Sequence, residues 1–164
     1  MNYEKLLTIM LGTGLKTADD FCEALMKADC NLKCNINVWG YDILGKPTFK
    51  VADKKTEVDL VIVSNAELGF ENGATVKETY SRAKEFGLEL CPNEVGPQLR
   101  LQYKDQPKGE WLLVAMEPIT DSFNGSRVFN VGRLNDGERI LDGYSARLDL
   151  MRRDNPSWVF LRRK

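Results

Sequence analysis

The sequence contains no histidine among its 164 residues. Histidine is the general base of Ser-His-Asp and Cys-His catalytic groups, the commonest metal ligand and the usual pH switch near neutrality. Its absence excludes these three kinds of site. An enzyme built from this chain would have to use carboxylates, tyrosine, lysine, arginine or cysteine. No catalytic motif of that kind is evident, and we predict that the protein is not an enzyme.

A long apolar run is also missing. The first apolar run, residues 6–11, is far shorter than the roughly 20 residues that a membrane-spanning helix needs. Lys5 is the only basic residue before this run and no small-residue cleavage site follows it, which is unlike a secretory signal. We interpret residues 6–11 as the first packed helix and expect a cytoplasmic protein that does not bind a membrane.

Neither sign of charge dominates the chain. It has 23 basic and 24 acidic residues, with 29% charged and 43% hydrophobic residues overall, which is the composition of a globular domain. The distribution is uneven, because residues 147–164 carry six basic residues against two acidic ones. A basic segment of this kind either attracts phosphate groups or is a solvated surface.

Cysteine is scarce, with four residues at Cys22, Cys30, Cys34 and Cys91. Because histidine is absent, a zinc site would need all four thiolates, and Cys30 and Cys34 have CxxxC spacing instead of the usual CxxC. No secretory signal supports a disulfide. We expect reduced, mostly buried thiols and no cofactor, while a metal held by these four cysteines stays an open alternative.

The first 90 residues are predicted to be mostly helical. Thr17 can cap a helix whose first turn is acidic. Residues 36–44 favour a short helix, and residues 57–63 favour a strand that enters the core. The capping box Thr75-x-x-Glu78 opens a further helix.

The rest of the chain is predicted to be rich in strands. Residues 99–104 alternate apolar and polar side chains, and we expect them to form a hairpin with the apolar residues 111–116. Three further features are a strand at 128–131, a tight hairpin turn at 135–137 and an apolar, hence central, strand at 158–161. Helices followed by strands indicate an α+β fold. We place a boundary near Cys91, between a helix-rich region 1–90 with one strand and a β-rich region 91–164.

The segment between Asn135 and Ser157 has no regular hydrophobic pattern, because neither helical nor strand periodicity persists there. More than twenty irregular residues inside a domain are unusual, and such a segment is either an ordinary surface loop or a binding surface. Its Tyr, Arg, Ser, Asn and Asp residues suit a binding surface, because they combine contact area with adaptable hydrogen bonding.

Three strings in the C-terminal region resemble a family of small, uncharacterised bacterial proteins. They are Glu-Val-Gly-Pro at 94–97, Asp-Gln-Pro at 105–107, and the closing Trp-Val-Phe-Leu-Arg-Arg-Lys at 158–164. In that family the segment before the closing run resembles the variable region of a target protein of a diversity-generating retroelement. There, adenine-directed mutagenesis of asparagine-type codons yields Asp, Ser, Tyr, Gly, Arg and Ile.

The resemblance implies a ligand-binding protein with a C-type-lectin-like fold in its C-terminal region. Its variable segment, residues 138–157, would present a changeable surface to a protein or another macromolecule. The implied ligand-binding residues are Ile140, Asp142, Tyr144, Ser145, Arg147, Asp149, Arg153, Asn155 and Ser157. The implied scaffold residues are Gly137, Leu141, Gly143, Trp158 and Phe160.

Two alternatives stay open. A carboxylate-based hydrolase would use acidic residues on or beside the expected central hairpin, namely Glu94, Asp105, Glu110 and Glu117. A nucleic-acid-binding accessory protein would use the basic residues near the C-terminus, namely Arg152, Arg153, Arg162, Arg163 and Lys164.

Overall fold

A mostly antiparallel, eight-stranded sheet organises the protein, whose computed structural model describes residues 3–28 and 38–163. The strands of this sheet are β1 (Lys5–Leu11), β2 (Thr56–Ser64), β4 (Leu88–Glu89), β5 (Trp111–Val114), β6 (Ile119–Thr120), β7 (Ser126–Arg133), β8 (Arg139–Ser145) and β10 (Ser157–Arg162). Their order is β1-β2-β10-β5-β7-β6, with β4 also paired to β10 and β8 to β7.

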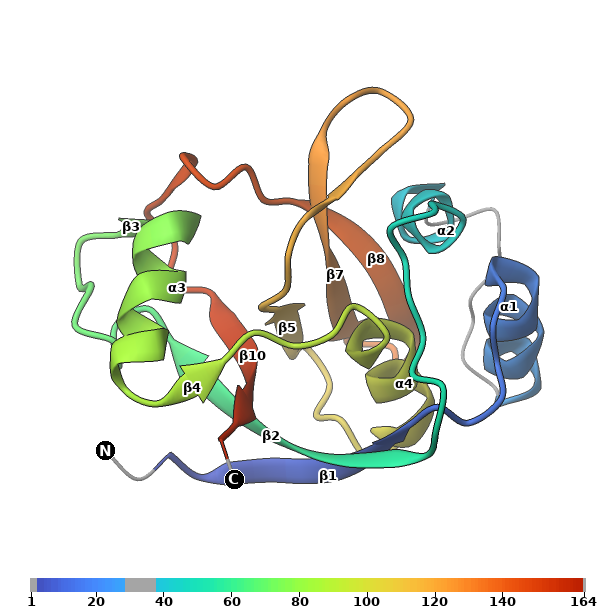
Figure 1. The fold of residues 1–164 in the computed structure, drawn as a ribbon. Coiled ribbons are helices and arrows are strands. Elements are labelled where there is room, and N and C mark those ends of the chain that lie inside the picture. The colour runs from blue at the N-terminus through green and yellow to red at the C-terminus, as the bar shows by residue number, and fades with distance from the viewer. Residues whose placement is uncertain (1–2, 29–37, 164) are drawn as a thin grey trace.

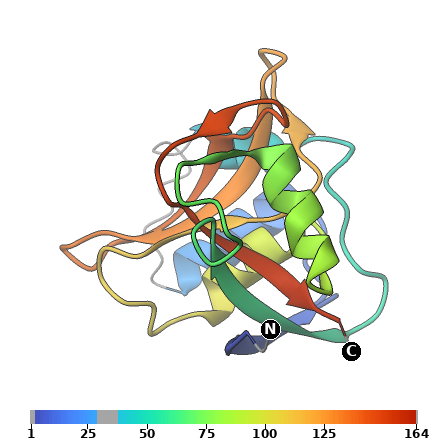
Figure 2. The ribbon, with the colours of Figure 1, turned by 90° about the vertical axis from the view of Figure 1, so that its left-hand side faces the viewer.

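Helices lie on both sides of this sheet, which makes the fold α+β. The helices α1 (Ala18–Lys27), α2 (Val38–Leu44) and α4 (Val95–Gln102) are on one side and α3 (Val76–Glu85) is on the other (Figure 1). The short strands β3 (Ala74–Thr75) and β9 (Met151–Arg152) pair with each other beside α3. Figure 2 looks onto α3, with β10 and β2 behind it.

The central position predicted for residues 158–161 is confirmed by the pairing of β10. One edge of β10 is antiparallel to β2. Its other edge runs parallel to β5 at Trp158 and Val159, and antiparallel to β4 at Leu161 and Arg162. Because β2 precedes Cys91 and β5 follows it, the sheet combines strands from both of the regions that the sequence suggests.

Several local predictions are confirmed. Capping boxes open both α1 and α3, where the hydroxyls of Thr17 and Thr75 accept the backbone N–H of Asp20 and Glu78, and these carboxylates accept the N–H of the two threonines. The short helix α2 and the strand β2 occupy the expected positions. A tight turn joins β7 to β8, and Gly137 adopts the positive φ of 93° that such a turn favours.

The interpretation of residues 6–11 as a helix is wrong, because they belong to β1. Residues Leu7–Leu11 pair in register with β2, and Ile9 and Leu11 are buried while Thr8 is exposed. An apolar run this short fits a strand as well as a helix, and here the pairing with β2 decides between them. The strand β1 therefore precedes the first helix, the strands β2, β3 and β4 lie among the helices, and only strands follow α4.

The expected hairpin of residues 99–104 with residues 111–116 is also wrong. Residues 99–102 form the end of α4, and β5 pairs with β7 and β10 instead. The polar side chain of Arg100, which suggested a solvent-facing position, is fully buried and donates to the carbonyl oxygens of Tyr103 and Gly132. Because the polar Arg100 stands between apolar residues, this helical segment shows the apolar–polar alternation that is expected of a half-exposed strand.

The irregular segment of residues 135–157 is shorter than expected. Residues 139–145 form β8, which pairs with β7 along its whole length. Its alternating burial is hard to see in the sequence because one face of β8 carries Asp142 and Tyr144 instead of apolar side chains. The truly irregular part is the β8–β10 connection, residues 146–156, in which only β9 is regular.

Candidate functional site

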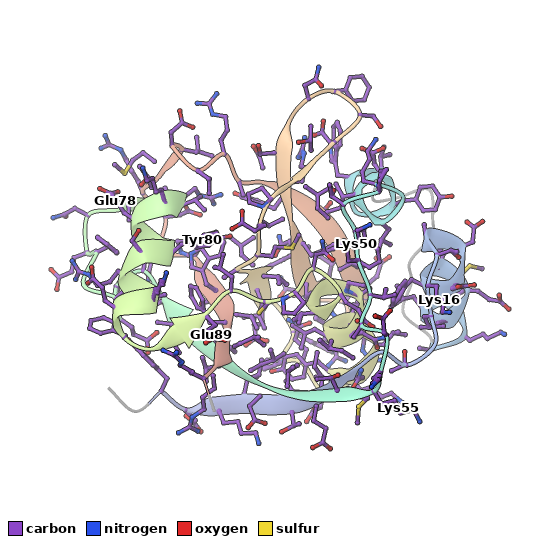
Figure 3. The ribbon with its side chains drawn as sticks, in the orientation of Figure 1. Lys16, Lys50, Lys55, Glu78, Tyr80 and Glu89 are labelled. Carbon is purple, nitrogen blue, oxygen red and sulfur yellow. The ribbon has the colours of Figure 1, made fainter. Side chains whose placement is uncertain are left out.

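The sheet face that packs against α3 extends beyond this helix into an open groove. Tyr80 of α3 points toward the sheet (Figure 3) and packs edge-on against Trp158 and Phe160, with ring centroids 5.6 and 6.3 Å apart. Its hydroxyl donates to the carbonyl oxygen of Met116 at 2.9 Å. Thus α3 covers β10, whereas the same face of β5, β7 and β8 forms the floor of an open groove.

Strand register places the residues on this floor. Trp158 is paired with Leu113, Leu113 with Asn130, and Asn130 with Asp142, so the four side chains form a row on one face across β10, β5, β7 and β8. The row begins under α3 and ends in the open groove. The groove has a volume of about 390 Å³ and is lined by Trp111, Leu113, Asn130, Asp142, Tyr144, Arg152, Asp154, Pro156 and Ser157.

Asn130 is the least expected residue of the floor. Its side chain is only 7% exposed, and its Oδ1 atom has no hydrogen-bond partner within residues 3–28 and 38–163. An unsatisfied buried acceptor costs about 1–3 kcal/mol. A buried polar group without a partner needs an explanation other than stability, and Asn130 is one of the residues that line the groove.

Asp142 lies opposite Asn130 on the neighbouring strand. One of its carboxylate oxygens accepts the backbone N–H of Gly143 at 2.7 Å. Burial raises the pKa of Asp142, although this backbone hydrogen bond and the charge of Arg127 oppose the shift. The floor therefore presents two acceptors side by side, one neutral and one acidic.

Two aromatic residues border these acceptors. The indole of Trp111 lies across Gly132, where an added Cβ would come within 2.3 Å of the ring, and Trp111 stays 37% exposed. On β8, the ring of Tyr144 carries the guanidinium of Arg152 at 4.4 Å from its centroid. Arg152 donates from Nε and Nη2 to the Asp154 carboxylate at 3.0 and 2.6 Å.

The groove continues past Tyr144 toward α2. This extension shares Asp142, Tyr144, Arg152 and Asp154 with the groove and is further lined by Trp39, Arg127, Gly143, Ser145, Leu150 and Met151. The Arg127 guanidinium stacks on Trp39 at 3.9 Å, and its Nε donates to Asp121 at 2.8 Å. That hydrogen bond lowers the pKa of Asp121, just as the bond from Arg152 lowers the pKa of Asp154.

The predicted ligand-binding residues fall into two groups. Asp142, Tyr144 and Ser157 line the groove, and Ser145 lines its extension. The others do not line either part: Ile140 is buried, Arg147 and Asp149 form an exposed ion pair, Arg153 is exposed, and Asn155 accepts the backbone N–H of Ala66. The predicted scaffold residues Leu141, Gly143, Trp158 and Phe160 are buried, and Gly137 lies in the β7–β8 turn.

Sequence reasoning missed the groove residues Trp111, Asn130, Arg152 and Asp154. For Asn130 a signal existed, because it is the one polar residue within the apolar run 128–131. In the sequence, Arg152 stands out only as part of a basic segment. Its position is set by β9, which pairs Arg152 with Ala74 and holds the β8–β10 connection beside the groove.

The residues of the two alternative functions are dispersed. The carboxylate of Glu94 is buried and bound by backbone N–H groups, while Asp105 and Glu117 are exposed and none of the four acidic residues lines the groove. Among the basic residues, Arg152 is committed to Asp154, and Arg163 contacts Glu89 at 3.4 Å. Lys164 lies outside the described residues.

The structure describes two of the four cysteines that are expected to be reduced, buried thiols. Cys22 and Cys91 are buried, and burial raises the pKa of Cys91. Cys30 and Cys34 lie outside the described residues. Within the described ranges no three His, Cys, Asp or Glu residues are grouped so that they could hold a metal ion, and no helix has the length and apolar character of a membrane span.

Comparison with known proteins adds no relative. No protein-family model matches the chain, and no match is found among curated proteins or solved structures.

The raised pKa of Asp142 leads to a prediction about stability. Because burial disfavours its charged form, Asp142→Asn is expected to raise the melting temperature at pH 7 by about 2 °C. The asparagine Oδ1 can still accept the N–H of Gly143. As the pH falls through the raised pKa, wild-type Asp142 becomes neutral, so the advantage should vanish. Calorimetry of both proteins between pH 7 and pH 3 tests this, and a variant less stable than wild type at pH 7 would contradict it.

Proposed function

We propose that this chain is a non-enzymatic ligand-binding protein that holds a protein, or another macromolecule, in the groove over β5, β7 and β8. The observation that carries the proposal is Asn130, a residue of the groove floor whose buried Oδ1 has no hydrogen-bond partner among the described residues. A bound donor would remove the cost of this unsatisfied acceptor.

The surroundings of the groove fit a macromolecular ligand better than a small one. The groove and its extension are open depressions bordered by exposed apolar side chains, including Trp111 (37% exposed) in the groove and Met151 (49%) in the extension. Phe123 is 79% exposed in the β6–β7 loop, which projects from the molecule in Figures 1 and 2, and it packs edge-on against Trp39 of the groove extension. Aromatic and methionine side chains at an open surface are typical of protein interfaces.

The surface has a rigid support. β8 is paired with β7 along its length, and α2 packs closely on the opposite face of β8, where an added Cβ on Gly143 would come within 2.8 Å of the Trp39 backbone. The β8–β10 connection is tied at Lys77, Ala66 and Asn65 by hydrogen bonds from their backbone N–H groups. Side chains that project from such a frame can change with little effect on the fold.

Diversification of this surface by a retroelement, and a C-type-lectin-like fold, stay predictions that rest on the resemblance. Deep sequencing of the gene in its source population tests the first. Changes confined to codons 138–157 are expected, whereas changes spread evenly along the gene would remove the claim.

Selection of a displayed random peptide library on the immobilised protein tests ligand binding. Enriched peptides are expected to bind wild type and to lose most of their affinity for Tyr144→Ala, which removes one side of the groove. Glu71→Ala, an exposed turn residue outside the groove, serves as the control. If enriched peptides bind Tyr144→Ala as well as wild type, the groove is not the binding site and the proposal fails.

A further inference from the structure

We infer that the groove recognises an organic cation, namely the guanidinium or ammonium group of a basic side chain on a protein ligand, through Asn130 and Asp142. This inference rests on the proposed function and specifies the chemistry of the ligand. Its basis is the number of hydrogen-bond acceptors on the floor, the balance of charge in the groove and the aromatic side chains around it.

The floor of the groove supplies acceptors without matching donors. Asn130 Oδ1 has no partner in the described part of the chain, and the only donor to the Asp142 side chain there is the N–H of Gly143. A guanidinium carries five N–H donors and an ammonium carries three, and neither has an acceptor. Either group could satisfy both residues, which occupy directly paired positions on β7 and β8, once the Asn130 side chain turns its buried Oδ1 toward the groove.

The charge balance of the groove also favours a cation. The arginines that reach the groove and its extension already have acidic partners, since Arg152 pairs with Asp154 and Arg127 with Asp121. Asp142 is left as the carboxylate without a salt bridge among the described lining residues. A bound cation would neutralise the charge of Asp142. A bound anion would be repelled by Asp142, and the two arginines near it already have acidic partners.

The neighbouring side chains suit an organic cation and not a metal ion. Trp111 is a partly exposed π-system beside the floor, and cations bind favourably over such rings, whereas the ring of Tyr144 already carries Arg152. Calcium requires six to eight oxygen ligands, and magnesium requires octahedral coordination. One carboxylate beside one amide cannot meet either requirement. A volume of about 390 Å³ is sufficient for a basic side chain and part of its backbone.

NMR titration with two matched peptides tests the inference. The probes are acetyl-Gly-Arg-Gly-amide and the same peptide with citrulline, which keeps the shape of arginine but is uncharged. With ¹⁵N-labelled protein, the arginine peptide is expected to shift the side-chain amide signals of Asn130 and to bind about tenfold more tightly than the citrulline peptide. Lys and norleucine peptides form a second matched pair.

Two variants complete the test. Asp142→Asn, which keeps the acceptor for Gly143 N–H, is expected to abolish the preference for arginine over citrulline. Asp53→Asn makes the same change of charge at an exposed position outside the groove and should leave the preference unchanged. The dispersion of the amide spectra verifies that both variants are folded.

The possible outcomes separate this inference from the proposed function. Peptides selected from the library could bind the groove while the arginine and citrulline probes bind equally. In that case the inference of cation recognition is wrong, but the proposal that the groove binds a ligand is not contradicted. The same holds if Asp53→Asn removes the preference as fully as Asp142→Asn does. If selected peptides bind outside the groove, both proposals fail.

Discussion

Glu94→Gln is expected to lower the free energy of unfolding by about 3 kcal/mol. The Glu94 carboxylate is fully buried at the start of α4. Its Oε1 accepts the backbone N–H of Gly12 and its Oε2 that of Ala52, both at 2.8 Å, and Gln98 donates to Oε1 at 3.1 Å. A glutamine offers one oxygen in place of two, so its NH₂ group would face one of these N–H donors in the buried site.

Chemical denaturation of wild type and Glu94→Gln measures this effect. Glu117→Gln makes the same chemical change at an exposed position and should stay within about 0.5 kcal/mol of wild type. Amide hydrogen exchange at Gly12 and Ala52 is expected to accelerate in Glu94→Gln. A loss of stability no larger than that of the control would show that Glu94 does not hold these two loops.

Gly96→Ala is expected to destabilise the protein by about 2–3 kcal/mol. An added Cβ would come within 2.3 Å of the ring of Phe129 on β7. Phe129 is fully buried, and Phe49 packs edge-on against it at 6.0 Å, so the ring has little room to move. Alanine is the better helix former by up to about 1 kcal/mol, and the expected value allows for this gain.

Thermal unfolding of a double-mutant cycle tests the clash. Phe129→Leu creates a cavity and should be destabilising alone, but it is expected to cost less in the Gly96→Ala background, where the smaller side chain relieves the contact. Gly45→Ala is the control, because the nearest atom to its added Cβ lies at an ordinary 3.5 Å. Additive effects of Gly96→Ala and Phe129→Leu would refute the clash.

Local signals in the sequence predicted the elements that local interactions stabilise. The capping residue Thr17 and the capping box at Thr75 identify the starts of α1 and α3 because their hydrogen bonds join residues only three positions apart. The apolar run in β10 identifies a central strand because both its faces are buried. These features do not depend on knowing which strands are neighbours.

The elements that were missed depend on distant partners. Arg100 is buried because Tyr103 and Gly132 accept its hydrogen bonds, and Gln102 of the same helix exchanges hydrogen bonds with the backbone of Met10. Such buried polar side chains hide the helical pattern of α4. Only the tertiary structure shows that these positions face inward.

The groove could be predicted only in part for the same reason. Asp142 and Tyr144 belong to the segment that the resemblance singles out. Asn130 joins them through the register of β7 with β8, and Arg152 through the pairing of β9 with β3. The pairing of β9 with β3 cannot be deduced from one sequence, and the predicted turn at 135–137 fixes the register of β7 with β8 only once residues 139–145 are known to form a strand.

The central position of β10 has a consequence for how the protein folds. The contacts that close the sheet join segments far apart in the chain, as when Trp158 Nε1 donates to Asn65 Oδ1 across 93 residues. Forming them requires the ordering of a long intervening loop before the contact is gained, which slows folding. During synthesis, β2 and β5 each keep one edge unpaired until Ser157–Arg162 has been made. Unpaired strand edges of this kind are prone to aggregation.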